Sequence, residues 1–242
     1  MTGKLKVLVF DDTEIHRKSA LLLLSEDYEL TVVGTYDEAQ EALVPVTDYD
    51  KAEEILPELL EVAGLKRDLD PLWAPKDHQV KYKALKAKSY VLATTYPNFD
   101  IVLTDLLVPA SQQAMVGDGL KFVGHEMSLG TTIALLALCG GVKKVAVVTD
   151  MNHHNHPGSA AFDCFSGCKA EGIKIICTNS VGLIKIDEAT GKLVEQAFLD
   201  TDEGRAKYPY PEGKNYGHRK GLSYGKDWKD VLLQLTGELK KE

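Results

Sequence analysis

The chain alternates short apolar runs with longer amphipathic segments over most of its length. The apolar runs are rich in β-branched residues, which is typical of strands buried on both faces of a parallel sheet. Five runs of this kind are predicted as strands: 5–10, 30–34, 99–104, 144–149 and 173–178. Because strands alternate with helical segments, the pattern predicts an α/β fold with a doubly wound parallel sheet.

The segments between the apolar runs have helical periodicity, capping residues or both. A helix is expected directly after the first strand, and others are expected over 37–43, 52–62, 77–94, 131–139, 157–170 and 227–239. Residues 46–98 are too long for a simple connection between two strands of one sheet. We therefore interpret 46–98 as a helical insertion.

A second insertion is expected over residues 180–226, before the final helix. Within it, Leu183–Phe198 predicts a β-hairpin that turns at Thr190-Gly191. Thr201–Lys226 is rich in Gly, Pro, Tyr and charged residues without a clear period, and it predicts a loop. With both insertions included, residues 1–242 are expected to form a single domain.

Composition excludes several classes of partner. The formal net charge is −8 at pH 7, which disfavours nucleic acid because binding to its backbone needs a surplus of Lys and Arg. No stretch approaches the ~18 apolar residues of a membrane span, and the first apolar run is too short for a signal peptide. The four cysteines do not suggest a disulfide framework. We expect a cytoplasmic protein that binds neither nucleic acid nor a membrane.

Polar side chains follow the carboxyl ends of the predicted strands. Asp11 and Asp12 end the first strand, and Asp105 ends the third. Thr149 and Asp150 end the fourth. In a doubly wound sheet these ends meet at the edge where ligands bind, and carboxylates that converge there repel one another unless a cation neutralises them. Hard oxygen ligands suit Mg²⁺, Mn²⁺ or Ca²⁺, so the sequence predicts a divalent-cation site.

Four segments, taken in order, resemble the receiver domain of two-component response regulators. VLVFDDTEIHR resembles the family's first strand and acid pair, and FDIVLTDLLVP resembles its third strand, with the phosphoacceptor aspartate and a proline four residues later. Gly117-Asp118-Gly119 resembles the Asp-Gly that opens the next helix, and KVAVVT resembles the fourth strand with its terminal hydroxyl residue. The resemblance covers about half of the chain and implies a flavodoxin-like or receiver-like fold.

The resemblance also implies a chemistry. Asp105 would be the nucleophile that accepts a phosphoryl group from a histidine kinase or a small phosphodonor. Asp12, Asp105 and the backbone carbonyl of Leu107 would ligate Mg²⁺, and Asp11 would act through a bound water. Thr149 would hydrogen-bond the phosphoryl oxygens. Catalysis of this kind is positioning plus cancellation of developing negative charge.

The chain departs from the family's pattern at two positions. Receivers have a Lys after the fifth strand, usually followed by Pro, whereas here the strand ends in Cys177-Thr178-Asn179-Ser180. Lys185, Lys214 and Lys220, in the second insertion, are the candidates for the place of this Lys. The residue after the family's Thr is usually small, but here it is Asp150. A more acidic pocket favours a metal and disfavours an anionic phosphoryl group.

A histidine-rich loop follows the fourth predicted strand. His153, His154 and His156 lie close to Asp150 in the sequence. Imidazole and carboxylate groups together suit Zn²⁺, Fe²⁺, Mn²⁺ or Ni²⁺, so this loop is a candidate transition-metal site, or a source of a general acid or base. The alternative is a solvated polar turn that caps the next helix.

Other histidines are less distinctive. His125 and Glu126 are expected on a loop at the same edge of the sheet as the acids. His16 and His78 have the sequence surroundings of ordinary surface residues. The three histidines of the loop lack the fixed helical spacing of a zinc-protease motif.

Three functions remain open from the sequence. The first is a stand-alone, atypical receiver-like signalling protein in which Asp105 is phosphorylated and whose partner is a histidine kinase or another signalling protein. The second is a metal-dependent enzyme, such as a phosphohydrolase, that uses the aspartates and the histidine loop. The third is a pseudo-receiver that binds a partner without being phosphorylated.

Overall fold

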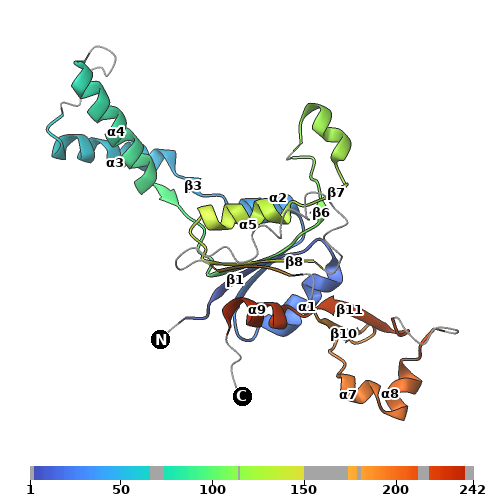
Figure 1. Ribbon diagram of the computed structural model, residues 1–242. Helices are drawn as coiled ribbons and strands as arrows, with labels where there is room; N and C mark the ends of the chain where they lie inside the picture. Colours follow the sequence, from blue (N-terminus) through green and yellow to red (C-terminus); the bar gives the residue numbers. More distant parts are fainter. Residues whose placement is uncertain are drawn as a thin grey trace. The chain divides into compact units, whose positions relative to one another are not determined.

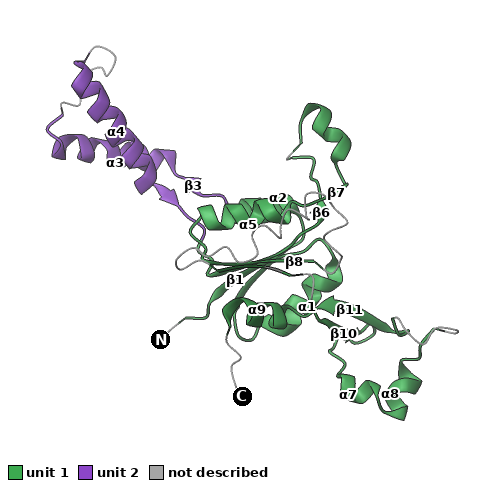
Figure 2. Cartoon of the chain, in the orientation of Figure 1, with its two compact units in different colours: residues 1–43, 98–242 green, residues 44–97 purple. Residues whose placement is uncertain are grey.

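A computed structural model describes residues 3–65, 74–113, 115–149, 174–178, 181–211 and 218–237. The chain divides into two compact units, which Figure 2 distinguishes by colour. Unit 1 contains residues 1–43 and 98–242, and unit 2 contains residues 44–97. The predicted helix over 157–170 lies outside the described residues.

A parallel sheet of five strands forms the centre of unit 1. Its strands are β1 (Lys6–Phe10), β2 (Glu29–Val33), β5 (Ile101–Asp105), β8 (Lys144–Val148) and β9 (Lys174–Thr178). They lie in the order β2-β1-β5-β8-β9 and all pair in parallel. This is the 2-1-3-4-5 order of flavodoxin-like folds, in which the strand order reverses between the first and third strands. The predicted doubly wound parallel sheet is confirmed.

Helices cover both faces of this sheet (Figure 1). Helices α1 (Glu14–Leu24) and α9 (Trp228–Thr236) pack on one face, against alternate residues of β1 and β5 such as Val9 and Leu103. On the other face lie α2 (Tyr36–Leu43) and α5 (Gly130–Cys139). The inner strands β1, β5 and β8 are largely apolar and buried, because successive side chains point to opposite faces and both faces are covered there, whereas the edge strand β2 is partly exposed.

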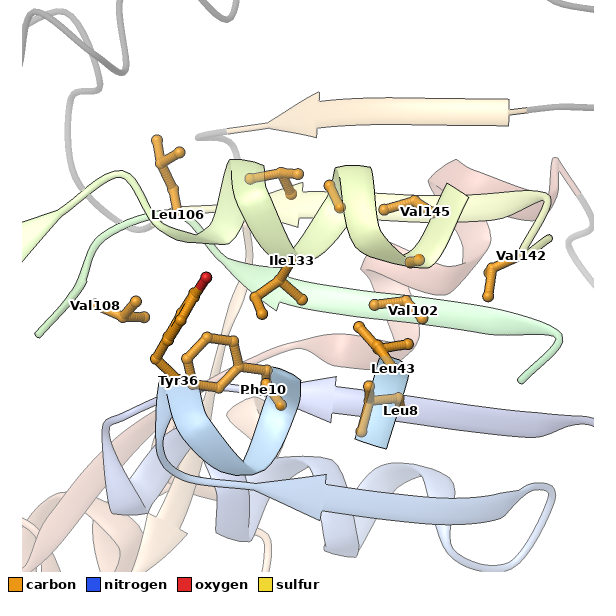
Figure 3. Close-up of a cluster of buried hydrophobic side chains, with 14 of the residues drawn as sticks. Leu8, Phe10, Tyr36, Leu43, Val102, Leu106, Val108, Ile133, Val142 and Val145 are labelled. Carbon is orange, nitrogen blue, oxygen red and sulfur yellow. The ribbon is translucent and has the colours of Figure 1, made fainter. Parts of the chain in front are cut away.

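The core beneath α2 and α5 is built from aromatic and branched side chains (Figure 3). Phe10 of β1 and Tyr36 of α2 lie in this core together with Ile133 of α5. Phe10 and Ile133 are fully buried. Because Phe10 directly precedes Asp11, this packing fixes the end of β1 from which the acidic side chains project.

Unit 2 is a pair of helices closed by a short two-stranded sheet. Helices α3 (Tyr49–Val62) and α4 (Lys76–Leu92) pack against each other, in agreement with the helices predicted over 52–62 and 77–94. Strand β3 (Val46–Thr47) pairs antiparallel with β4 (Thr94–Thr95), so the two ends of the unit meet.

The segment before α9 differs from its prediction. Strand β10 (Leu183–Asp187) pairs antiparallel with β11 (Leu222–Lys226), and only the single bridge Ile186–Leu193 reflects the hairpin predicted over 183–198. The intervening chain contains α7 (Gln196–Leu199) and α8 (Asp202–Lys207) where the sequence predicted hairpin and loop. Leu199, Tyr208 and Leu222 form a small core there, which stabilises this excursion.

The connection from β5 to α5 also differs from expectation. Gly117-Asp118-Gly119 opens a short 3-10 helix, η1 (Gly117–Phe122), and not the helix that covers the sheet, which begins only at Gly130. Strands β6 (Val108–Pro109) and β7 (Glu126–Met127) pair at the base of this connection. Within the described part of the chain, no helix combines the length and apolar character that a membrane crossing requires.

Candidate functional site

Three carboxylates meet at the carboxyl edge of the sheet. Asp11 and Asp12 follow β1, and Asp105 ends β5, the strand that pairs with β1. One carboxylate oxygen from each residue lies within 4.8 Å of the others. Asp11 is fully buried and Asp105 is nearly so, whereas Asp12 is half-buried. The cluster lies at the switch in strand order, where this type of fold binds ligands.

Hydrogen bonds from the start of α1 hold the acid pair in place. Arg17 donates from Nη1 to the backbone carbonyls of Asp11, at 2.8 Å, and Asp12, at 2.6 Å. The backbone N–H of Thr13 donates to Asp11 Oδ1 at 2.9 Å. The guanidinium group of Arg17 thus satisfies the carbonyls of Asp11 and Asp12, and the backbone N–H of Thr13 fixes one carboxylate oxygen of Asp11.

A lysine lies between two of the carboxylates. Lys226 Nζ is 2.7 Å from Asp11 Oδ2 and 2.8 Å from Asp105 Oδ1, and it donates a hydrogen bond to each. The Lys226 side chain is fully buried. Burying an ammonium group is costly unless it is paired and hydrogen-bonded. Lys226 is therefore an integral member of the acidic cluster.

Sequence reasoning missed Lys226 and named three other lysines. Lys185 donates to the side chain of Gln196 at 2.7 Å and forms no described ion pair with the cluster. Lys220 forms no described ion pair with the cluster, and Lys214 lies outside the described residues. Among the lysines that the structure describes, the one paired with the cluster is Lys226, the last residue of β11.

The path of the chain explains how Lys226 reaches the site. The backbone N–H of Asp227 donates to the carbonyl of Gly182 at 2.7 Å, so the β10–β11 excursion ends where it began. The chain leaves the central domain after Gly182 and returns beside it at Asp227, so Lys226 lies close to the end of the segment that follows β9. The signal in the sequence was a lysine directly before Asp227, the N-cap of the final helix, whose side chain accepts from the N–H groups of Lys229 and Asp230.

The two oxygens of Asp105 have different surroundings. Oδ1 accepts from Lys226 Nζ and also from the backbone N–H of Leu106, at 2.9 Å. Oδ2 accepts no hydrogen bond from the residues that the structure describes. One oxygen is fixed, and the other is available to a metal or an electrophile.

Burial and mutual repulsion change the proton affinities of the cluster. Burial raises the pKa of Asp105 to about 7, because the opposing effect of the Lys226 charge is smaller and Asp11 adds a further increase. Burial and the charge of Asp11 also raise the pKa of Asp12 above its usual range. Burial disfavours the Lys226 ammonium, but the charges of Asp105 and Asp11 outweigh it and raise the pKa of Lys226.

The raised pKa of Asp105 predicts a pH-dependent stability. Its folded-state pKa, about 7, exceeds its ordinary value of 3.8, so this group contributes stability at low pH that is lost as the pH rises through about 7. In EDTA, the free energy of unfolding of wild type should fall relative to Asp105→Asn by roughly 1–3 kcal/mol between about pH 5 and pH 8. Urea unfolding at several pH values measures this difference, and a difference that stays constant would contradict it.

The remaining predicted residues divide into two groups. Leu107 and Thr149 lie at the same edge, because Leu107 follows β5 by two residues and Thr149 directly follows β8. Thr149 is buried, and its N–H donates to the carbonyl of Thr178 at 3.0 Å. The other predicted ligands, Asp150, His153, His154 and His156, lie outside the described residues.

Two further expectations have clear outcomes. Glu126 on β7 lies close enough to raise the pKa of Asp12 slightly, after the larger effects of burial and Asp11, as expected for a residue at this edge. His125 stacks edge to face with Phe122, with ring centroids 6.4 Å apart. His16, expected on the surface, is buried against the chain around Lys226. That expectation is wrong because β11 covers this part of α1.

Comparisons with known proteins identify no relative: no family model, no curated protein and no solved structure matches the chain.

Proposed function

We propose that this protein is an atypical receiver-like signalling protein whose Asp105 accepts a phosphoryl group in the presence of Mg²⁺. The observation that carries the proposal is the position of Lys226, which is hydrogen-bonded to Asp11 and Asp105 at the strand-order switch, while Asp105 Oδ2 accepts no hydrogen bond from the described residues. A lysine at this position removes the main departure from the receiver pattern that the sequence suggests.

The charge of the cluster fits a divalent cation. Three carboxylates against one ammonium leave two negative charges when all four groups are ionised, and a divalent ion balances them. Asp12 and the open oxygen of Asp105 are the ligands we propose, together with the backbone carbonyl of Leu107. This all-oxygen set suits Mg²⁺ or Mn²⁺, and Mg²⁺ commonly takes one or two carboxylates and keeps several waters. When bound, the ion would reduce the repulsion between Asp105 and an incoming phosphoryl group.

The protein's own residues support the transfer step. Asp105 Oδ2 attacks phosphorus in an acyl phosphate or in a phosphohistidine of a partner kinase. A P–O bond to Asp105 forms, and the bond from phosphorus to the acyl oxygen or histidine nitrogen breaks, with its electron pair leaving on that atom. Lys226 can follow the new negative charge while it stays near Asp11, and the hydroxyl of Thr149 lies at the end of the next strand, β8. This is positioning and charge cancellation.

The direct test is the intact mass of the protein after incubation with acetyl phosphate and Mg²⁺. We expect an adduct of one phosphoryl group in wild type and none in Asp105→Asn or when EDTA is present. Lys226→Met should bind Mg²⁺ but form little adduct, since the cation that balances the phosphoryl charge is missing. A wild-type protein that binds Mg²⁺ and forms no adduct would contradict phosphoryl acceptance and favour a pseudo-receiver.

A metal-dependent phosphohydrolase is the alternative function from the sequence. It uses the carboxylate cluster together with Asp150 and histidines of the loop, and these last residues lie outside the described residues. The described ion pairs of Asp11 and Asp105 are with Lys226, and this arrangement supports the receiver-like function.

A further inference from the structure

The backbone of Lys226 is held by two side chains of α1. Its N–H donates to His16 Nδ1 at 3.2 Å, and its carbonyl lies 2.9 Å from Ser19 Oγ, whose single hydroxyl hydrogen is shared between this carbonyl and that of His16 at 2.7 Å. Ser19 is fully buried and His16 is 7% exposed. Both backbone polar groups of the residue that carries the buried ammonium are therefore satisfied by one helix, in a place where water would not replace them.

Neighbouring contacts make this attachment close. The indole N–H of Trp228 donates to the carbonyl of His16 at 2.8 Å. A Cβ on Gly225 would lie 2.5 Å from Ser19 Cβ, so only glycine allows β11 to approach α1 this closely. Residues 225–228 thus lie against the first turns of the helix that begins just after Asp11 and Asp12.

The sheet does not position Lys226. Within the described residues, β11 pairs with β10 alone, in a separate two-stranded sheet, while Asp105 ends a strand of the central sheet and Asp11 directly follows another. A lysine side chain is long and flexible, so the position of its Cα must be fixed by other contacts if Nζ is to stay between two carboxylates. The contacts to α1 provide this, because α1 packs on the central sheet and follows the acid pair directly.

We infer that Ser19 and His16 are positioning residues for Lys226: by binding its backbone they hold its ammonium between Asp11 and Asp105. Any role of the Lys226 ammonium in phosphoryl transfer rests on the proposed function. The positioning itself does not depend on it. The fixed Cα also places Nζ within reach of a phosphoryl group on Asp105, so α1 and the β10–β11 excursion become one support for the site.

The test measures how well Lys226 is protected from acylation by an amine-reactive reagent, by mass spectrometry of its peptide. The reactivity of Lys207, whose side chain is 55% exposed, is the internal reference. Ser19→Ala and His16→Leu each remove one hydrogen bond to the Lys226 backbone, and we expect about a fivefold rise in Lys226 reactivity. His16→Asn, whose amide oxygen can accept in the place of Nδ1, should keep the wild-type reactivity. Lys18→Ala changes the exposed side of the same helix and serves as the matched control.

Two parallel measurements make the result decisive. Amide exchange in β1 reports global unfolding, and Mg²⁺ titration of wild type reports the proposed function. A rise in Lys226 reactivity in Ser19→Ala and His16→Leu with unchanged β1 exchange supports positioning, even if wild type binds no Mg²⁺, in which case the proposed function fails alone. Unchanged Lys226 reactivity, or a rise matched by faster β1 exchange, overturns the inference, even if Mg²⁺ binds.

Discussion

Replacing Lys226 by methionine is expected to lower the free energy of unfolding by about 3–5 kcal/mol at neutral pH without divalent cations. The change removes the ammonium that lies 2.7 Å from Asp11 and 2.8 Å from Asp105. Methionine fills a similar volume but leaves the two buried carboxyl groups without a counter-charge, so at neutral pH they either stay ionised and repel each other or take up a proton. The cost arises mainly from this uncompensated charge, since breaking one side of a buried ion pair is more damaging than replacing the whole pair.

Divalent cation should reverse much of this loss. With Lys226 absent, Mg²⁺ is the remaining source of positive charge, and we expect it to bind the variant about tenfold more tightly than wild type. Urea unfolding followed by circular dichroism, in EDTA and in Mg²⁺, measures both effects. Asp105→Asn combined with Lys226→Met should be more stable than Lys226→Met alone, because one unpaired charge is gone.

The control is Lys207→Met. Lys207 also pairs with a buried carboxylate, Asp187, at 3.2 Å, but its own side chain is 55% exposed. Solvent screens this charge, and Asp187 keeps hydrogen bonds from Tyr208 and Thr190. The Lys207→Met change should therefore cost much less than Lys226→Met. Equal losses in the two variants would mean that the cluster at the sheet edge does not depend on its lysine.

The central sheet could be predicted because its signals are local. The inner strands are short apolar runs bounded by polar residues, and the helices that cover the two faces of the sheet have a periodicity that is also local. The acidic cluster followed from the same information. Asp11, Asp12 and Asp105 end strands that the doubly wound topology brings together, so the strand ends alone placed them at one edge.

Lys226 could not be placed from local signals. Its strand, LSYGK, contains a glycine and ends in a charged residue, and it pairs with a strand far earlier in the chain. A pairing between strands this far apart in the chain gives no local sequence signal. The turn residues Thr190-Gly191 do give one, and they led to a predicted hairpin with the wrong partner for β10. His16 and Ser19 were equally hidden, because a helix gives no sign of a distant strand that will cover it.

The site is therefore assembled at two scales. The carboxylates come from the ends of adjacent strands and need only the sheet. The ammonium group of Lys226 comes from the β10–β11 segment, and its position needs the close contact between Gly225 and Ser19. In the receiver-like site that we propose, Lys226 places a positive charge beside Asp105, as the lysine of receivers does. Here the lysine comes from the end of β11 and not from the end of the fifth strand of the central sheet. A movement of the β10–β11 segment would change the distance between Lys226 Nζ and Asp105.

Replacing Gly130 by alanine is expected to have the second large effect, a loss of about 3 kcal/mol in the free energy of unfolding. Gly130 begins α5, and a Cβ at this position would lie 1.8 Å from the backbone oxygen of Asp105 and 2.9 Å from Cα of Leu106. These are backbone atoms, so no side-chain rotation relieves the overlap. Either α5 must move off the sheet or the end of β5 must shift.

Both responses would damage the site, because Asp105 is the last residue of β5 and Leu106 donates to its Oδ1 at 2.9 Å. We expect weaker Mg²⁺ binding and little phosphoryl adduct in Gly130→Ala, beside its lower stability in urea. Gly119→Ala is the matched control, since its Cβ would meet only the flexible side chain of Met115 at 3.5 Å, and its stability should change by less than about 0.5 kcal/mol. Wild-type stability and Mg²⁺ affinity in Gly130→Ala would mean that the close contact between α5 and β5 does not hold Asp105 in place.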